Sequence, residues 1–196
     1  MAEQTRDRIL NAGIACFAAH GYKGATTRTL AGAAGVNIAT LAYHFGDKQG
    51  LYRAAIDRLY ERLLALQPEP SLVVSGPPRD RIADVARFAV RCAREHQTEV
   101  RLLLRHALEE GQLPAPLRER WVGELLEQAE VVREFLGLAR DPSFRLKILA
   151  LNHLVLRFAI TPPQELAPFV SDPAAGQAEV EALLVELAQN LLAGRA

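Results

Sequence analysis

Apolar residues at the start of the chain recur at a helical spacing. Ile9, Gly13 and Phe17 lie four residues apart. A four-residue repeat places side chains on one face of a helix, so these positions predict an amphipathic helix with one buried stripe. Gly21 is expected to end this helix.

The same periodicity returns further along the chain, first in short segments and then in longer ones. Thr26 and Thr27 are capping candidates for a second helix that stops at Gly35, because glycine favours the backbone conformation that ends helices. The other predicted helices cover residues 38–44, 48–66, 79–95, 98–110, 116–138, 142–160 and 177–193.

Proline and glycine divide these helices into two groups. The segment 67–78 reads QPEPSLVVSGPP, and its four prolines and one glycine cannot continue a helix. We therefore expect a first domain at residues 1–66 and a second at residues 67–196. No segment shows the alternation typical of a strand. The predicted fold class is all-α, with about nine helices arranged as a three-helix head, a connecting helix and a helical body.

The composition fits a globular chain whose charge is unevenly distributed. Of 196 residues, 49% are hydrophobic and 23% are charged, which is enough apolar material to bury a core. The 23 basic and 23 acidic residues balance over the whole chain. Up to Leu66, however, there are eight basic and five acidic residues, a net charge of +3, so the remainder carries −3. This asymmetry is mild support for a polyanionic partner at the N-terminal end.

The cysteines and the N-terminus indicate a reducing, cytoplasmic location. Cys16 and Cys92 lie far apart, and neither has a second cysteine or a paired histidine at metal-ligand spacing, so we expect no metal site. The N-terminal segment is polar, and no run of about 18 uncharged apolar residues occurs. We expect neither export nor a membrane span.

The segment 26–52, TTRTLAGAAGVNIATLAYHFGDKQGLY, meets the requirements of two short helices joined by a tight turn. Such a pair needs a small residue where the helices cross, here Ala31, and a glycine in the turn, here Gly35. Leu30 and Leu41 would hold the second helix against the first. Its outward face then carries small and hydroxylated side chains, which can approach base edges in the major groove of DNA.

This segment resembles the DNA-binding head of the tetracycline-repressor (TetR) family. In that family a TTRxLA-like start, a GV turn, a TL pair and an HF element followed by a lysine recur at these spacings. The resemblance covers the first third of the chain and implies a helix-turn-helix that binds operator DNA. The residues that it assigns to DNA binding are Thr27, Arg28, Asn37, Ile38, Ala39, Thr40, Tyr43, His44 and Lys48.

Some of these assignments carry a specific role. Lys48 would pair with a phosphate at the start of a helix, where backbone N–H groups also favour an anion. His44 would either reach the DNA backbone or lie buried with its hydrogen bonds satisfied. Phe45, Leu51 and Tyr52 are expected in the core, where they brace the recognition helix.

The family's architecture also implies a body that forms a homodimer, because two recognition helices on two half-sites multiply affinity and specificity. The last two predicted helices carry broad apolar stripes, which either serve a partner as well as the core or face only inward. The residues predicted at the dimer interface are Leu149, Asn152, Leu156, Val180, Leu184, Leu187 and Leu191.

A body of this kind binds a small-molecule effector, which the sequence does not identify, and no other cofactor is expected. Pockets for such ligands combine aromatic bulk with a few polar groups, although the same side chains also form ordinary cores. The candidates for the effector pocket are Phe88, Cys92, Leu103, His106, Trp121, Phe135, His153 and Phe158.

The predicted function is a regulator of transcription that binds a palindromic operator as a homodimer. We expect it to be a repressor that a small-molecule effector releases from DNA. An enzyme is the first alternative, but EHQTE around His96 is not a metal-binding HExxH, and the chain has no Gly-rich phosphate loop or nucleophile elbow. A helical carrier or interaction module is the second alternative. The outward positions of Thr40, Tyr43 and Lys48 argue against it.

Overall fold

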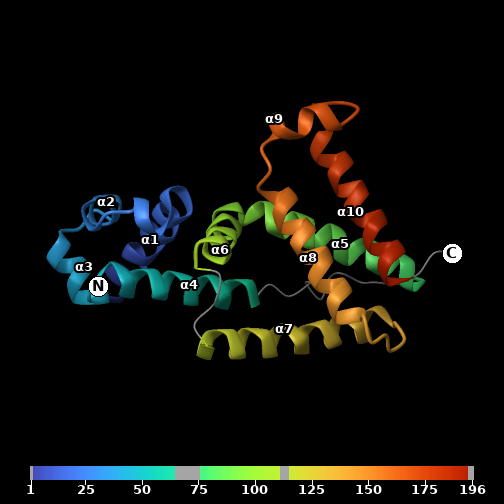
Figure 1. Cartoon of the computed structure of the whole chain (residues 1–196), viewed down its shortest axis with the longest axis horizontal. Coiled ribbons are helices and arrows are strands. Elements are labelled where there is room, and N and C mark those ends of the chain that lie inside the picture. The colour runs from blue at the N-terminus through green and yellow to red at the C-terminus, as the bar shows by residue number, and fades with distance from the viewer. Residues whose placement is uncertain (1, 65–75, 111–114, 194–196) are drawn as a thin grey trace. The chain divides into compact units, whose positions relative to one another are not determined.

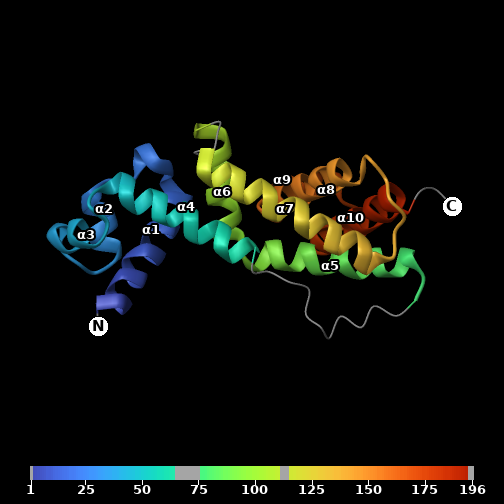
Figure 2. The ribbon, with the colours of Figure 1, turned by 90° about the horizontal axis from the view of Figure 1, so that it is seen from below.

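The computed structural model describes residues 2–64, 76–110 and 115–193. All regular secondary structure within these ranges is helical, in ten α-helices and one 3-10 turn, which confirms the predicted all-α class. Figures 1 and 2 show the helices in two perpendicular views. The predicted boundary at residue 66 and most of the predicted linker 67–78 lie outside the described residues.

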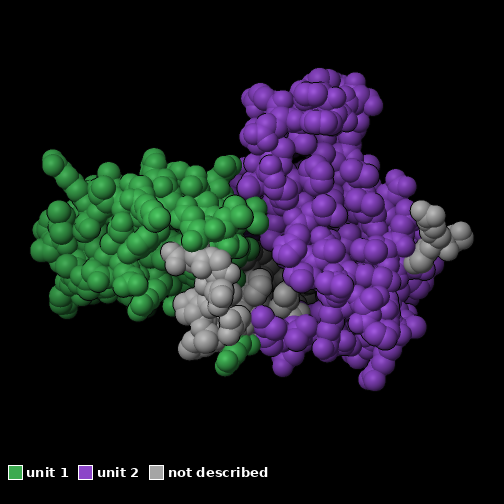
Figure 3. All heavy atoms as spheres, in the orientation of Figure 1, with its two compact units in different colours: residues 1–65, 98–121 green, residues 66–97, 122–196 purple. Residues whose placement is uncertain are grey.

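The chain forms two compact units, coloured separately in Figure 3. Unit 1 comprises residues 1–65 and 98–121, and unit 2 comprises residues 66–97 and 122–196. The units therefore differ from the two expected segments, because residues 98–121 join the N-terminal helices rather than the body. The chain passes between the units three times.

Unit 1 is built on α1 (Ala2–Gly24), α2 (Thr27–Ala33), α3 (Ile38–Phe45), α4 (Lys48–Leu64) and α6 (Gln97–Glu110). Helix α1 packs on α2 and α4, and α3 packs on both α2 and α4. The predicted apolar stripe of α1 is buried, and α1 is kinked at Gly21, where φ is 69°. Both views show α2 and α3 together at the end of unit 1 that lies farther from α6 (Figures 1 and 2).

Unit 2 contains α5 (Pro78–Glu95), most of α7 (Ala115–Leu136), α8 (Phe144–Ala159) and α10 (Gly176–Leu192). Helices α5, α8 and α10 pack against one another. Two apolar clusters hold them together, because hydrophobic stripes from several helices meet there and leave water. The buried members of these clusters are Ile82, Leu136 and Ala188 in the first, and Val90, Val180 and Leu184 in the second.

The segment between the predicted helices 142–160 and 177–193 is not entirely a loop. It contains a short α9 (Pro163–Leu166) and a 3-10 turn, η1 (Ala167–Phe169). Both have proline in the first turn, which proline's fixed φ allows, although proline in a sequence equally marks a loop. The helical pattern therefore does not reveal them. Pro78 likewise begins α5 rather than preceding it.

Candidate nucleic-acid interface

The turn between α2 and α3 has the geometry that the sequence predicted. Gly35 has a φ of 62°, a left-handed conformation that glycine adopts without steric cost. The Val36 N–H donates to the Ala31 carbonyl at 3.0 Å, and the Gly35 N–H donates to the Gly32 carbonyl at 3.1 Å. These bonds satisfy the last carbonyls of α2 and turn the chain at once into α3.

Side-chain caps fix the beginning of both helices. Thr26 is the N-cap of α2, and it forms a reciprocal capping box with Thr29. Asn37 is the N-cap of α3, where its side-chain oxygen accepts from the Thr40 N–H at 2.7 Å and from the Thr40 hydroxyl at 2.9 Å. Two residues assigned to DNA binding therefore also hold each other in place at the start of the recognition helix.

The outer face of α3 is open to solvent. Tyr43 is 83% exposed and Ile38 is 50% exposed, whereas Leu41 on the inner face is fully buried. Ala39 is exposed, and Arg28 is exposed near the start of α2. An apolar and an aromatic side chain held out into water next to small residues suit a partner that covers this face.

Of the remaining assigned residues, Asn37 is exposed, whereas Thr40 and Lys48 are half-buried. Thr27, the first residue of α2, and His44 are half-buried. The His44 ring stands edge-on to the Tyr43 ring, with 5.1 Å between the ring centroids. His44 is thus neither fully buried nor fully exposed, and both roles foreseen for it stay open.

Lys48 has partners that the sequence pattern did not indicate. Its ammonium group donates to the backbone carbonyls of Tyr22 and Ala25, each at 3.0 Å, and lies 4.3 Å from the centroid of the Tyr22 ring. Two of its three N–H donors are thereby used to join α4 to the end of α1. One donor remains available for a phosphate.

The start of α4 is held tightly against the end of α3. The Asp47 carboxylate accepts from the Gly50 N–H at 2.7 Å and so caps α4. A Cβ atom at position 50 would overlap the carbonyl oxygen of Phe45. Only glycine allows this close approach, which fixes the recognition helix relative to α4.

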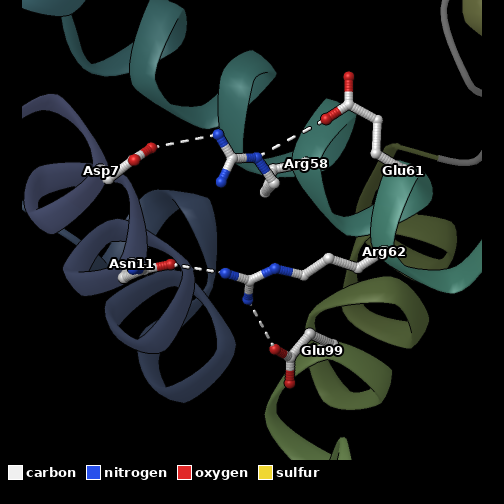
Figure 4. Close-up of polar contacts among 6 residues, drawn as sticks. All are labelled: Asp7, Asn11, Arg58, Glu61, Arg62 and Glu99. Carbon is white, nitrogen blue, oxygen red and sulfur yellow. Dashed lines mark hydrogen bonds and ion pairs between the residues drawn. The ribbon is translucent and has the colours of Figure 1, made fainter. Parts of the chain in front are cut away.

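Two arginines one turn apart on α4 bind polar residues one turn apart on α1 (Figure 4). Arg58 donates to the Asp7 carboxylate at 3.2 Å and also pairs with Glu61. Arg62 donates to the Asn11 side-chain oxygen at 2.9 Å, as Figure 4 shows, and with its other terminal nitrogen to the Glu99 carboxylate of α6 at 3.0 Å. Arg62 therefore connects three helices of unit 1.

Helix α6 is attached to the head at several further points. The Tyr52 hydroxyl and the His106 Nδ1 atom are 2.9 Å apart in a buried hydrogen bond, and Arg105 donates to the Ala19 carbonyl at 3.2 Å. Val100 and Leu102 are fully buried. These contacts explain why residues 98–121 belong to unit 1. No local pattern indicated them, because the partners are tens of residues apart in sequence.

The residues predicted to line an effector pocket are divided between the units. Leu103 and His106 are buried in unit 1, whereas Phe88, Cys92 and Phe158 are half-buried in unit 2. Phe135 and His153 are exposed, and Trp121 lies in α7 with its side chain outside the described residues. Neither unit by itself brings the eight side chains together.

A surface hollow of about 700 Å³ is present elsewhere in unit 2, between the end of α7 and the start of α8. It is polar, because it is lined by Glu130, Arg133, Glu134, Arg140, Asp141, Pro142 and Arg145. Several of these side chains pair with one another, such as Arg133 with Glu130 at 2.9 Å. Hydrogen bonds from Lys147 and Ser143 lower the pKa of Asp141 to about 2.

The residues predicted at a dimer interface also divide into two sets. Leu156, Val180 and Leu184 are buried within the subunit, where the last two belong to the second apolar cluster. Their packing is therefore accounted for without a partner. Leu149, Leu187 and Leu191 are exposed, and Asn152 is half-buried. Leu146 on α8 and Leu183 on α10 are exposed as well.

Comparison with known proteins places the head in a family. Residues 9–55 match the profile described as bacterial regulatory proteins of the tetR family. The HTH-type transcriptional repressor AcnR of Corynebacterium efficiens is 32% identical over 143 residues, which cover 73% of this chain and 55% of that protein. AcnR of Corynebacterium glutamicum is 39% identical over 69 residues, 35% of this chain and 37% of that protein. The chain thus matches about half or less of these relatives' length.

The solved structures extend the likeness to the whole fold. A transcriptional regulator of Streptomyces coelicolor superposes with a TM-score of 0.67 at 22% identity, over 93% of this chain and 97% of the other. A TetR-like regulator of Rhodococcus sp. RHA1 gives a TM-score of 0.62 at 19% identity, over 97% of both chains. Together with the helix-turn-helix geometry above, the profile match and the AcnR relatives identify the head of this chain as that of the TetR family of bacterial regulatory proteins, and the solved structures show the same fold over the whole chain. No helix in the described residues is long and apolar enough to cross a membrane.

Proposed function

We propose that this protein is a sequence-specific DNA-binding regulator of transcription, which binds a palindromic operator through α2 and α3 as a homodimer. The observation that carries the proposal is that α3 is held at both ends while its outer face is exposed. Both of its ends are fixed, by the Asn37 cap at one end and the Gly50 contact at the other, while Ile38 and Tyr43 extend into solvent. A rigid helix with an exposed reading face suits insertion into a major groove.

The proposed contacts fall into two kinds. Asn37, Thr40 and the small or apolar residues between them are the candidates for base edges, since the Asn37 amide nitrogen and the Thr40 lone pairs are not used by their mutual bonds. Arg28 and the third N–H of Lys48 are candidates for groove-edge and phosphate contacts. Contacts of the second kind position the protein and carry the salt dependence.

The exposed leucines of α8 and α10 support the homodimer. Leu146 and Leu149 on α8, and Leu183, Leu187 and Leu191 on α10, project from two helices that pack side by side. The α10 residues are spaced by four and form one continuous stripe. Pairing this face with its copy buries the stripe in an intermolecular four-helix bundle.

Control by a small-molecule effector is the remaining part of the proposal, and its support is family membership. An effector that binds the non-DNA geometry better by about 1–3 kcal/mol would lower operator affinity about 5- to 150-fold. Repression is the sign that we propose, because a dimer on a promoter blocks polymerase without further contacts. The proposal of effector release fails if ligand-bound and DNA-bound dimers have the same separation between their recognition helices.

Selection of bound duplexes from a random-sequence pool tests the central claim. The purified protein is expected to enrich a palindromic motif and to bind it orders of magnitude more tightly than random DNA. Titration of the winning duplex at several salt concentrations then gives the number of phosphates contacted. Absence of any motif, with weak binding that depends only on salt, would contradict the proposal and favour a helical carrier or interaction module.

A further inference from the structure

An arginine outside the helix-turn-helix lies against the end of the recognition helix. The guanidinium carbon of Arg6, in α1, is 5.2 Å from the centroid of the Phe45 ring, at the last residue of α3. Figures 1 and 2 both show the N-terminal end of α1 at the same end of unit 1 as α3. Stacking on an aromatic face holds an arginine that would otherwise sample many rotamers.

The stacked guanidinium of Arg6 is otherwise unused. Within the part of the chain that the structure describes, Arg6 takes part in no ion pair or hydrogen bond, whereas Arg58 and Arg62 are bound to carboxylates and to Asn11. Contact with the face of the ring uses none of the guanidinium N–H groups in a conventional hydrogen bond. The N–H groups of Arg6 therefore stay able to donate.

The position of Arg6 also has an electrostatic consequence. The C-terminal end of a helix carries partial negative charge, which repels the phosphates of DNA brought close to it. Arg6 places a positive charge at this end of α3, against the last residue of the helix. The end of the recognition helix thereby becomes compatible with a nearby phosphate.

We propose that Arg6 binds a backbone phosphate of DNA next to the C-terminal end of α3, with the Phe45 ring as its support. The inference rests on the proposed DNA-binding function and adds a contact from α1 to it. A guanidinium donates two parallel N–H bonds to a phosphate, which strengthens the contact and fixes its geometry. Such a contact carries no base information and acts on all sequences alike.

Arg6→Gln and Arg8→Gln form a matched pair for the test. Both remove one exposed positive charge from α1, but residues two apart point to different sides of a helix, so Arg8 is not on the Phe45 side. Each variant is titrated with the duplex selected by the wild-type protein and with a random duplex, over a series of salt concentrations. Thermal unfolding checks that both variants are folded.

We expect Arg6→Gln to weaken binding to both duplexes by about tenfold at low salt, and to flatten the log–log salt slope by about two units for a dimer with two such arginines. Arg8→Gln should change affinity by less than about twofold and leave the slope unchanged. Equal effects of the two substitutions would overturn the Arg6 contact while leaving the proposed function intact. Failure of the wild-type protein to prefer its selected duplex would instead contradict the proposed function.

A double-substitution cycle tests the support from Phe45. Phe45→Leu keeps an apolar side chain but removes the aromatic face. It should weaken binding severalfold in the wild-type background and have a smaller effect in the Arg6→Gln background, because the stacked arginine is then already absent. Additive effects would show that Phe45 does not position Arg6. The cycle compares the effect of Phe45→Leu in the wild-type and Arg6→Gln backgrounds, so a loss of stability that is common to both backgrounds cancels.

Discussion

In unit 1 the helix ends are fixed by polar groups, whereas in unit 2 the helices are held mainly by apolar clusters. Thr26, Asn37 and Asp47 each cap a helix of the head with a side-chain oxygen. In unit 2, α5, α8 and α10 begin without a side-chain cap, and two apolar clusters join these helices. Local polar bonds specify the orientation of short helices, while apolar stripes need long helices to be effective.

The exposed surfaces of the two units also differ in polarity. The recognition helix of unit 1 shows small, hydroxylated and aromatic side chains, but α8 and α10 of unit 2 show a group of leucines. A partner with both polar edges and methyl groups suits the first surface, and an apolar partner such as a second copy suits the second. One chain therefore presents two surfaces of different chemistry, each suited to a different kind of partner.

The largest effect is expected from Gly50→Ala in unit 1. The new Cβ would overlap the Phe45 carbonyl, so α3 and α4 must separate, at a cost of about 3 kcal/mol or more with loss of DNA binding. Gly32→Ala is the control, because that exposed helical glycine has no neighbour within 4 Å and should gain up to about 1 kcal/mol. Urea unfolding followed by circular dichroism measures both. Equal stability of the two variants would refute the close contact.

Next in size is the effect of Leu187→Glu on the apolar surface of unit 2. A buried charge in the proposed bundle should convert the dimer to a monomer and lower operator affinity about a hundredfold or more, with helicity unchanged. Leu108→Glu is the control, since Leu108 is 86% exposed on α6 and belongs to unit 1. Sedimentation velocity distinguishes the species. A Leu187→Glu protein that stays dimeric would place the interface elsewhere.

Lys48→Ala tests whether Lys48 both stabilises the fold of unit 1 and contacts DNA. It leaves the carbonyls of Tyr22 and Ala25 without their donor, which should cost about 1.5–3 kcal/mol of stability. It should also weaken all duplexes alike and flatten the salt slope by about one unit per subunit. Arg53→Ala, at an exposed position of the same helix, is the control for stability. A loss of stability without a change of slope would assign Lys48 a purely structural role.

Asn37→Asp separates the role of Asn37 as the cap of α3 from its proposed contact with DNA. The carboxylate still accepts from the Thr40 N–H, so stability should change by less than about 0.5 kcal/mol. Its negative charge should nevertheless weaken binding to every duplex about tenfold. Asn37→Ala gives the opposite pattern in stability, a loss of about 1 kcal/mol. Thermal unfolding measures the stability of the two variants, and DNA titration measures their affinity.

The smallest expected effect is on the pH dependence of the stability of unit 2. Asp141 has its pKa lowered from 3.8 to about 2 by bonds from Lys147 and Ser143, so it stabilises the folded state when ionised. That contribution is complete above the unfolded pKa and is lost as the pH falls from about 4 through about 2. Asp141→Asn keeps an acceptor for Ser143 but does not titrate. Acid unfolding curves of the variant should therefore be flatter than those of the wild type in this window.

The sequence by itself determined the all-helical class, the helix-turn-helix and the ends of most helices. Those features depend on signals that act within about four residues, such as the Thr26 and Asn37 caps and the left-handed Gly35. The residues proposed for DNA binding are assigned by the resemblance of this segment to the TetR-family head. Their side chains occupy neighbouring positions on two short helices and the first residue of a third.

Only the tertiary structure decided which residues work together across long separations. The bond of Tyr52 to His106 places α6 in unit 1, Lys48 reaches back to Tyr22, and Arg6 stacks on Phe45. The tertiary structure also sorted the leucines of α8 and α10 into buried and exposed sets, which a helical repeat alone cannot do. The physical reason is that periodicity reports which side of a helix is apolar, whereas burial depends on which other helices pack against that side.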